Sequence, residues 1–143
     1  MAYCTQSDIL NQITTVELIQ LTDDAVAGVI NTTIVARAIA DADAEIDGYL
    51  GSRHVVPLTT VPAIVLKISV DLSIFNLYSR RGTIPDIRAD RYKNAIRFLE
   101  QVGQGKISLG ASDPGGNPPE SNAPEMSGSN PERSFTRSTL ESF

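Results

Sequence analysis

The sequence predicts a mainly α-helical fold, a small bundle of four to five helices followed by a long extended C-terminal arm. Apolar residues recur at steps of three or four through most of the first hundred residues, which is the spacing of one helix face. Prolines, glycines and short polar residues stand where helices begin and end. After Gly110 the composition changes, and 18 of the 33 residues from 111 to 143 are Pro, Gly, Ser or Asn. We therefore expect one helical domain at residues 1–110 and an arm at 111–143.

The first two helical segments are short. Thr5 is placed to cap a helix start, with Asp8 near the exposed N–H groups of the first turn. This helix is expected to run to about Thr14. A short amphipathic turn follows over residues 16–21, and residues 23–31 form a loop.

The longest amphipathic helix begins after a cap at Asn31 or Thr32 and ends near Gly51 or Ser52. Its apolar stripe consists of Val35, Ile39, Ala42, Ile46 and Tyr49. Between these positions fall four acidic residues that we expect to project mainly away from the stripe: Asp41, Asp43, Glu45 and Asp47. Residues 56–58 must be extended, because the residue before a proline is pushed out of the helical region.

The last two helices complete the predicted domain. Pro62 opens a helix that is apolar almost all round, and this helix should therefore be central and buried, ending at Gly82. The final helix starts near Pro85 and closes at Gly103, and residues 106–109 can form a short strand. Its expected stripe is Ile87, Tyr92, Ala95, Ile96, Leu99 and Val102. We expect one core cluster made of Ile64, Leu66, Ile68, Leu72 and Phe75 facing Ile39, Ile46, Ile96 and Leu99.

Charge is distributed unevenly along the chain. The net charge is −5, but residues 1–52 carry −7 and residues 53–110 carry +5. Opposite charges of this kind predict contacts between neighbouring copies, with solvated faces as the open alternative. The predicted subunit-contact residues are Asp41, Asp43, Glu45, Asp47, Arg80, Arg81, Arg88, Arg91 and Arg97.

The sequence offers little sign of catalysis or cofactor binding. Cys4 and His54 are the only cysteine and histidine, and neither has a partner at a known catalytic or metal-ligand spacing. Residues 23–34 faintly resemble a calcium loop, but alanines occupy two ligand positions, so calcium binding is rejected. No phosphate-binding loop is present. The single cysteine and the lack of a leader or spanning segment favour a soluble cytoplasmic product. Because no cofactor-binding motif is found, we expect no cofactor.

Several blocks of the chain, taken in order, resemble a known phage family. They are residues 3–9, 18–23, 38–58, Val61-Pro62, Asp71, residues 91–96 and residues 105–110. Together they are similar to the head-completion proteins of Mu-like phages and prophages, a family often described only as a domain of unknown function. His54 departs from the usual aromatic residue after the arginine, and the loop at Asp23 lacks most of the acidic residues that some members carry.

The resemblance implies a small helical adaptor of the head-to-tail connector, without catalytic or cofactor sites. Such a protein would form a homo-oligomeric ring of twelve copies under the portal protein and join it to stopper or tail-completion proteins. The virion would then hold it at the head–tail interface, with DNA passing through the channel without sequence-specific binding and no membrane contact. The arm at 111–143 would dock on the portal, with an adjacent adaptor copy as the alternative partner, through Met126, Phe135, Leu140 and Phe143. The alternative is a small DNA-binding regulator that uses the basic helix from Arg88 to Arg97.

Overall fold

The computed structural model describes residues 2–109, and the arm predicted for residues 111–143 lies outside the described residues. Within 2–109 the chain is α-helical and contains no β-strand. The helices are α1 (Gln6–Leu10), α2 (Thr15–Thr22), α3 (Thr32–Leu50), α4 (Ala63–Arg81) and α5 (Asp86–Gly103). The predicted mainly α-helical fold is confirmed.

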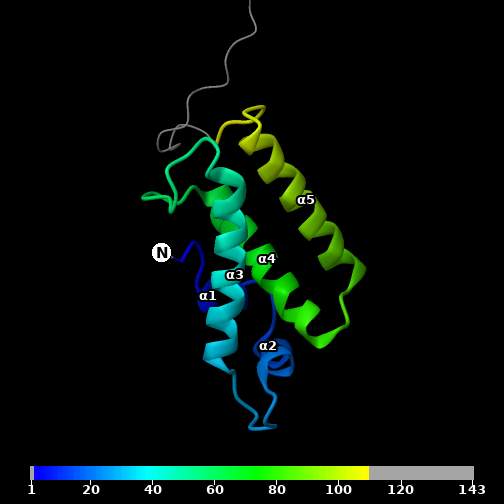
Figure 1. The fold of residues 1–143 in the computed structure, drawn as a ribbon. Helices are drawn as coiled ribbons and strands as arrows, with labels where there is room; N and C mark the ends of the chain where they lie inside the picture. The colour runs from blue at the N-terminus through cyan, green and yellow to red at the C-terminus, as the bar shows by residue number, and fades with distance from the viewer. Residues whose placement is uncertain (1, 110–143) are drawn as a thin grey trace, which may run out of the picture.

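Helices α3, α4 and α5 form an elongated bundle in which successive helices run in opposite directions (Figure 1). Helix α4 contacts all four other helices, which confirms the prediction that it is central. The short helices α1 and α2 cover the lower half of the bundle as seen in Figure 1. The loop between α2 and α3 forms one end of the molecule, and the turn after α5 lies at the other end.

Local side-chain chemistry sets the first helix boundaries. Thr5 caps α1 as predicted, and the Asp8 carboxylate accepts a hydrogen bond from the Thr5 backbone N–H at 2.8 Å. Helix α1 ends at Leu10 and not near Thr14, because Thr14 instead caps α2 and accepts a bond from the Glu17 N–H at 3.2 Å.

The later boundaries follow the proline and glycine positions. Asn31 caps α3 by accepting two backbone N–H groups. Pro62 and Pro85 precede α4 and α5 with φ of −62° in both cases, a value that their rings favour. Gly82 ends α4 in the left-handed region at φ +79°, where other residues would be strained.

The prediction of a short strand at residues 106–109 is wrong. Gly105 turns the chain at φ +73°, and the N–H groups of Lys106 and Ile107 both donate to the carbonyl oxygen of Gln101. Because these donors are satisfied by the end of α5, they are not available to a strand partner.

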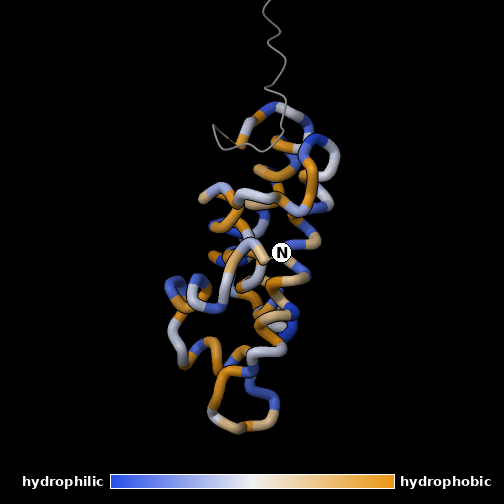
Figure 2. The backbone as a smooth tube through the Cα atoms, turned by 90° about the vertical axis from the view of Figure 1, so that its left-hand side faces the viewer, coloured by the Kyte–Doolittle hydropathy of each residue, from blue (hydrophilic) through white to orange (hydrophobic). Residues whose placement is uncertain are grey.

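Among residues 2–109 the core consists of two clusters, and α4 contributes to both. The upper cluster contains Tyr3, Ala42, Ile46, Leu50, Leu58, Val65, Ile68, Leu72, Ala95, Leu99, Val102 and Leu109. The lower cluster contains Cys4, Ile9, Ile13, Leu18, Leu21, Val35, Ala38, Ile39, Val70, Ile74 and Leu77. Figure 2 shows the apolar positions interleaved with polar ones along the helices, as expected for amphipathic packing.

The predicted core is confirmed in part, because Ile46, Ile68, Leu72 and Leu99 are buried and other members of the predicted set are not. Ile39 belongs to the lower cluster and does not face the others of the predicted set. Leu66 is 38% exposed and Ile87 is 64% exposed, so neither is a core residue. Phe75 is half-buried and stacks on Tyr92 with ring centroids 4.0 Å apart. Helical periodicity shows which side of its own helix a residue lies on. It does not show how much of that side neighbouring helices cover.

The upper end is closed by a tight approach between the ends of α3 and α5. The Ser52 hydroxyl donates to the carbonyl oxygen of Gly103 at 3.1 Å. A Cβ atom at Gly103 would lie 2.7 Å from the carbonyl oxygen of Tyr49, and one at Gly105 would lie 1.7 Å from the Arg53 guanidinium. Glycine is required at 103 by the close backbone oxygen of Tyr49 and at 105 by the left-handed backbone at φ +73°, whereas the Arg53 side chain could move aside.

Candidate functional site

Asp43 is buried, which corrects the prediction that it belongs to an outward acidic face. One carboxylate oxygen accepts the Tyr3 backbone N–H at 3.2 Å, and the other accepts the Ser69 hydroxyl at 2.9 Å. Burial raises the pKa of this carboxyl above its usual range. Asp43 therefore joins the N-terminal segment to α3 and α4 inside one subunit. Its predicted role as a subunit contact stays a prediction.

Glu45 and Asp47 are also used within the subunit, as acceptors of tyrosine hydroxyls. The Tyr92 hydroxyl on α5 donates to Glu45 at 2.8 Å. The Tyr3 hydroxyl donates to Asp47 and in turn accepts the backbone N–H of Leu58 at 3.0 Å. A third pair of this type links Tyr78 on α4 to Glu17 on α2.

In each of these three pairs the pKa of the tyrosine hydroxyl is raised. Burial, together with the bond to a carboxylate, raises the pKa of the three hydroxyls to about 12. The bonds therefore depend on a protonated phenol. Sequence reading missed them because the partners lie between 44 and 61 residues apart.

Asp41 is the most outward of the four acids on α3. Its side chain is 56% exposed and pairs with Arg37 one turn earlier, at 3.1 Å. An exposed pair of this kind contributes little to stability, so Asp41 is available to a partner. Its predicted role as a subunit contact stays a prediction.

Arg80 and Arg81 at the end of α4 hold the loop between α2 and α3. Both guanidinium groups donate to the carbonyl oxygen of Leu21 at 3.2 Å, and Arg81 also donates to that of Asp23 at 2.8 Å. Both pair with the Asp24 carboxylate, Arg81 at 3.3 Å. The two arginines predicted as subunit contacts therefore have internal partners.

The arginines of α5 do not form one uniform basic surface. Arg88 is half-buried, and its Nη1 atom has no hydrogen-bond partner among the described residues. Arg91 donates to Gln12 at 2.9 Å and to Asp71 at 3.4 Å. Arg97 is exposed. Of the three, Arg97 is the one most open to a neighbouring subunit or to DNA.

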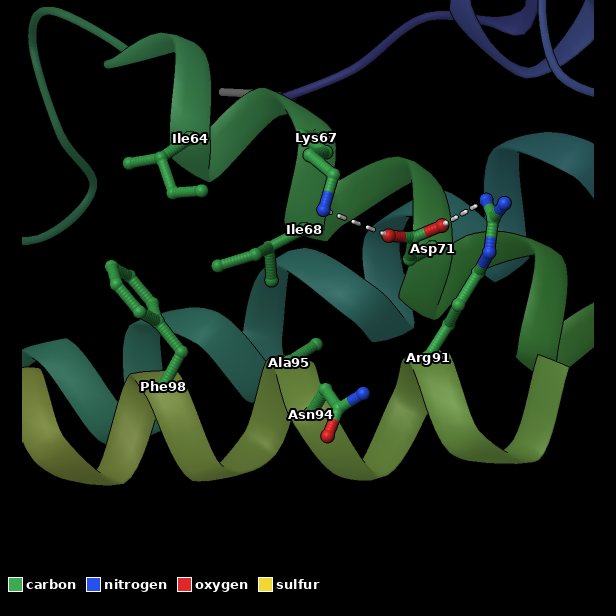
Figure 3. Close-up of a pocket in the computed structure, with 8 residues that line it drawn as sticks. All are labelled: Ile64, Lys67, Ile68, Asp71, Arg91, Asn94, Ala95 and Phe98. Carbon is green, nitrogen blue, oxygen red and sulfur yellow. Dashed lines mark hydrogen bonds and ion pairs between the residues drawn. The ribbon is translucent and has the colours of Figure 1, made fainter. Parts of the chain in front are cut away.

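A cavity of about 200 Å³ lies between α4 and α5 (Figure 3). The Asp71 carboxylate, only 4% exposed, faces Lys67 at 3.8 Å and Arg91 at 3.4 Å. The two cations are 64% and 45% exposed, so a positive rim surrounds the buried carboxylate. The cavity is lined by Ile64, Lys67, Ile68, Asp71, Arg91, Asn94, Ala95 and Phe98.

The cavity was not predicted from the sequence, although one part of it could have been. Asp71 was noted only through the family resemblance, and its four-residue spacing from Lys67 is the helical spacing of an ion pair. Arg91, in contrast, reaches Asp71 from another helix, and no pattern within one helix reports that approach.

The residues weighed for catalysis have structural surroundings. Cys4 is buried with its Sγ atom 3.7 Å from the Ser73 hydroxyl, and burial raises the pKa of its thiol, which disfavours the reactive thiolate. His54 is also buried. Among residues 2–109, no group of three or more His, Cys, Asp or Glu side chains is placed to hold a metal ion. None of the helices described there is long and apolar enough to cross a membrane.

The fold defines a small helical-bundle protein with a cavity between α4 and α5 that combines apolar and charged side chains. The chain belongs to the family described as "Bacteriophage Mu, Gp36", whose match covers residues 3–127. The resemblance to Mu-like phage and prophage proteins is thereby confirmed.

Two relatives illustrate the family. The "Mu-like prophage FluMu protein gp36" of Haemophilus influenzae is 44% identical over 79 residues, which cover 55% of each chain. "Gene product J" of Escherichia phage Mu is 37% identical over 111 residues, which cover 77% of each chain. The present chain therefore spans about half the length of the first relative and about three quarters of the second.

Proposed function

We propose that this protein is a structural virion protein, the head–tail connector adaptor that joins the portal protein to the stopper or tail proteins. Its membership of a bacteriophage Mu family is the observation that carries this proposal. The shape of the bundle supports it, because a connector needs two separate attachment regions. The loop at residues 23–30 and the turn that leads to Leu109 lie at opposite ends of the molecule (Figure 1).

The C-terminal segment supplies the attachment to the portal in this proposal. Its composition, in which 18 of 33 residues are Pro, Gly, Ser or Asn, is typical of segments that bind a partner in extended form. The anchors are Met126, Phe135, Leu140 and Phe143. An extended peptide of this kind binds through backbone pairing or in a groove, and ordering it reduces the net affinity.

A ring of twelve copies beneath the portal is the proposed assembly. Of the exposed members of the predicted contact set, Arg80, Arg81 and Arg91 already bind other segments of the subunit, so Asp41 and Arg97 are the residues to test first. Asp41→Lys should weaken ring formation more at low salt than at high salt, because exposed charges are screened. Equal assembly of the variant and the wild type at both salt concentrations would refute a charge contact at this position.

The central test uses the full chain and a chain truncated after Gly110. Native masses are measured with and without purified portal rings. We expect the full chain to join the portal and the truncated chain to keep its helical circular-dichroism spectrum but lose stable attachment. A third chain, in which residues 111–143 are shuffled at constant composition, separates a specific arm from a passive tail. Unchanged attachment of the truncated chain refutes the docking arm.

The same preparation distinguishes the adaptor from a DNA-binding regulator. A regulator that used residues 88–97 would bind short duplex DNA with an affinity that falls steeply as salt rises. The internal engagement of Arg91 and the partial burial of Arg88 weaken that alternative. Salt-sensitive DNA binding without portal attachment would overturn the adaptor proposal.

A further inference from the structure

Arg88, in the first turn of α5, has no partner for its charge among the described residues. Its side chain is half-buried, and its Nη1 atom is buried without a hydrogen-bond partner there. The ion pairs found in the described chain use four other arginines, Arg37, Arg80, Arg81 and Arg91. Because a partly buried cation is stabilised by an opposite charge, this guanidinium is placed to bind a carboxylate.

The acidic residues around Arg88 do not neutralise it. Burial and the bond to Glu17 raise the pKa of Tyr78 to about 12, and the charge of Arg88 acts in the opposite direction, which places these side chains near one another. Glu17 nevertheless accepts the Tyr78 hydroxyl and forms no ion pair with Arg88. Asp86 is exposed, but residues two apart on a helix do not face each other, so it lies away from the guanidinium.

An exposed apolar side chain stands next to this cation. Ile87 is 64% exposed and belongs to neither core cluster. Burying such a side chain in a contact removes apolar area from water and is favourable. We call Ile87 and Arg88 the start patch of α5. A partner that fits the start patch has a hollow for the isoleucine and an unpaired carboxylate for the arginine.

Glu100, near the other end of α5, is such a carboxylate. It is exposed, and its side chain makes no hydrogen bond or ion pair with the described residues. It lines a shallow hollow at the upper end of the bundle together with Gly48, Tyr49, Ser52, Gly103 and Gln104. The two glycines carry no side chain, so they leave room for the side chain of a neighbour.

We propose that the start patch of one copy docks in the hollow around Glu100 of a second copy, with Ile87 against the hollow and Arg88 paired with Glu100. Both charges lack an ion pair within the described chain, so this contact does not compete with an internal one. The inference rests on the proposed ring, whose subunit contact it specifies.

The other hollows of the described chain fit the start patch less well. The cavity between α4 and α5 carries Lys67 and Arg91, whose excess charge repels an arginine. A hollow on α3 has Asp43 and Asp47 in its wall, but both carboxylates already accept hydrogen bonds inside the subunit. A third hollow, between α3 and α4, is lined by two arginines that are already paired with aspartates.

The start patch and the hollow lie at opposite ends of α5, as Figure 1 shows for the helix. They are different surfaces of the same chain, and the contact is therefore heterologous. Each copy offers its start patch to one neighbour and its hollow to the other, so the contact repeats until the rotation closes a ring.

The first experiment exchanges the two charges. Arg88→Glu places two acids at the contact and Glu100→Arg places two arginines there, so each variant alone should lose self-association roughly tenfold or more. An equal mixture of the two variants should associate again, because copies that alternate around the ring restore an opposite pair at every contact. Self-association is measured by native mass against concentration, alone and with portal rings. Lys93→Glu changes an exposed cation on the same helix, and this matched control should leave association unchanged.

Folding is checked for each variant by thermal unfolding. Glu100→Arg changes an exposed side chain and should keep the wild-type midpoint, so it tests the contact even where the change at half-buried Arg88 destabilises the chain. Ile87→Gln should also keep the midpoint and should lose association, because it removes the apolar part of the start patch. Val29→Gln, at a position 61% exposed in the loop before α3, is its matched control and should associate as the wild type does.

The second experiment locates the receiving surface. Ile87→Cys combined with Gln104→Cys should give a ladder of covalent oligomers on mild oxidation, because Gln104 lines the hollow. The two positions are roughly 26 Å apart along one helix, so a disulfide within a single copy is not possible. Each single variant, and Val29→Cys combined with Gln104→Cys, should give no ladder beyond a dimer. The native Cys4 is buried.

The outcomes distinguish this inference from the proposed function. If the wild type does not self-associate with or without portal rings, the adaptor proposal itself fails. If the wild type forms rings and Glu100→Arg forms them equally well, the contact at Glu100 is refuted while the adaptor proposal survives. If the mixture stays dissociated, or if Asp86→Arg and not Glu100→Arg restores the association of Arg88→Glu, the pairing of Arg88 with Glu100 is overturned.

Discussion

Replacing Asp43 with alanine removes the carboxylate that joins the N-terminal segment to α3 and α4. The change leaves two buried donors without their acceptor, the Tyr3 backbone N–H and the Ser69 hydroxyl. Each unsatisfied buried group costs about 1–3 kcal/mol. Removal of a carboxylate whose charged form is disfavoured by burial offsets part of that cost, so we expect a net loss of about 2 kcal/mol.

The assay is thermal and urea unfolding followed by circular dichroism. A loss of about 2 kcal/mol lowers the midpoint of a domain of this size by roughly 10 °C. Asp41→Ala is the matched control, because Asp41 lies on the same helix but is exposed, and its pair with Arg37 is worth about 0.5 kcal/mol. Identical midpoints for the two variants would refute the structural role of Asp43.

The pH dependence of the same comparison provides a second check. The pKa of Asp43 is raised in the folded state, so the folded state binds its proton more tightly than the unfolded state does. The stability that this carboxyl contributes is therefore fully present below its unfolded pKa and falls as pH rises through its folded pKa. We expect the difference between the wild type and Asp43→Ala to be larger in acid than at neutral pH, and a smaller difference in acid would contradict the assigned direction.

Three further outcomes follow from the described contacts. The hydroxyl pKa values of Tyr3, Tyr78 and Tyr92 are raised to about 12, so stability should hold below about pH 10 and be lost as pH rises towards 12. Urea unfolding across that range tests this, and a flat profile counts against the three bonds. Leu72→Ala should lower the free energy of unfolding by about 3–4 kcal/mol, because Leu72 is fully buried. Phe75→Ala should lower it by only about 2 kcal/mol, because Phe75 is half-buried. Equal losses for the two variants in denaturant unfolding would show that the burial of Phe75 is misjudged.

A structural feature could be predicted from the sequence when the residues that cause it lie close together along the chain. Helix ends were predictable because their causes are local, as at Thr5, Asn31 and Gly82. The first helix was predicted too long because Thr14 can extend a helix or begin a new one, and only the path of the chain decides which. The central position of α4 was predictable from apolar residues all round it.

The candidate site was less accessible to prediction. The acids of α3 were taken as one outward face, yet Asp43 and Asp47 bind the N-terminal segment, and Glu45 binds α5. The cavity depends on Arg91 reaching Asp71 from a separate helix. Nor does any local pattern report that Val26 is held in the left-handed region.

The helical class, the order of the helices, most of their ends and the phage family could all be inferred from the amino-acid sequence. These features depend on residues within a few positions of one another, whose spacing and backbone preferences are local. Which charged side chains bind partners inside the subunit, and which remain exposed, became clear only from the folded structure. A carboxylate between two apolar positions can face solvent or a neighbouring helix, and the choice depends on donors that folding brings from more than 20 residues away, as Ser69 is brought to Asp43.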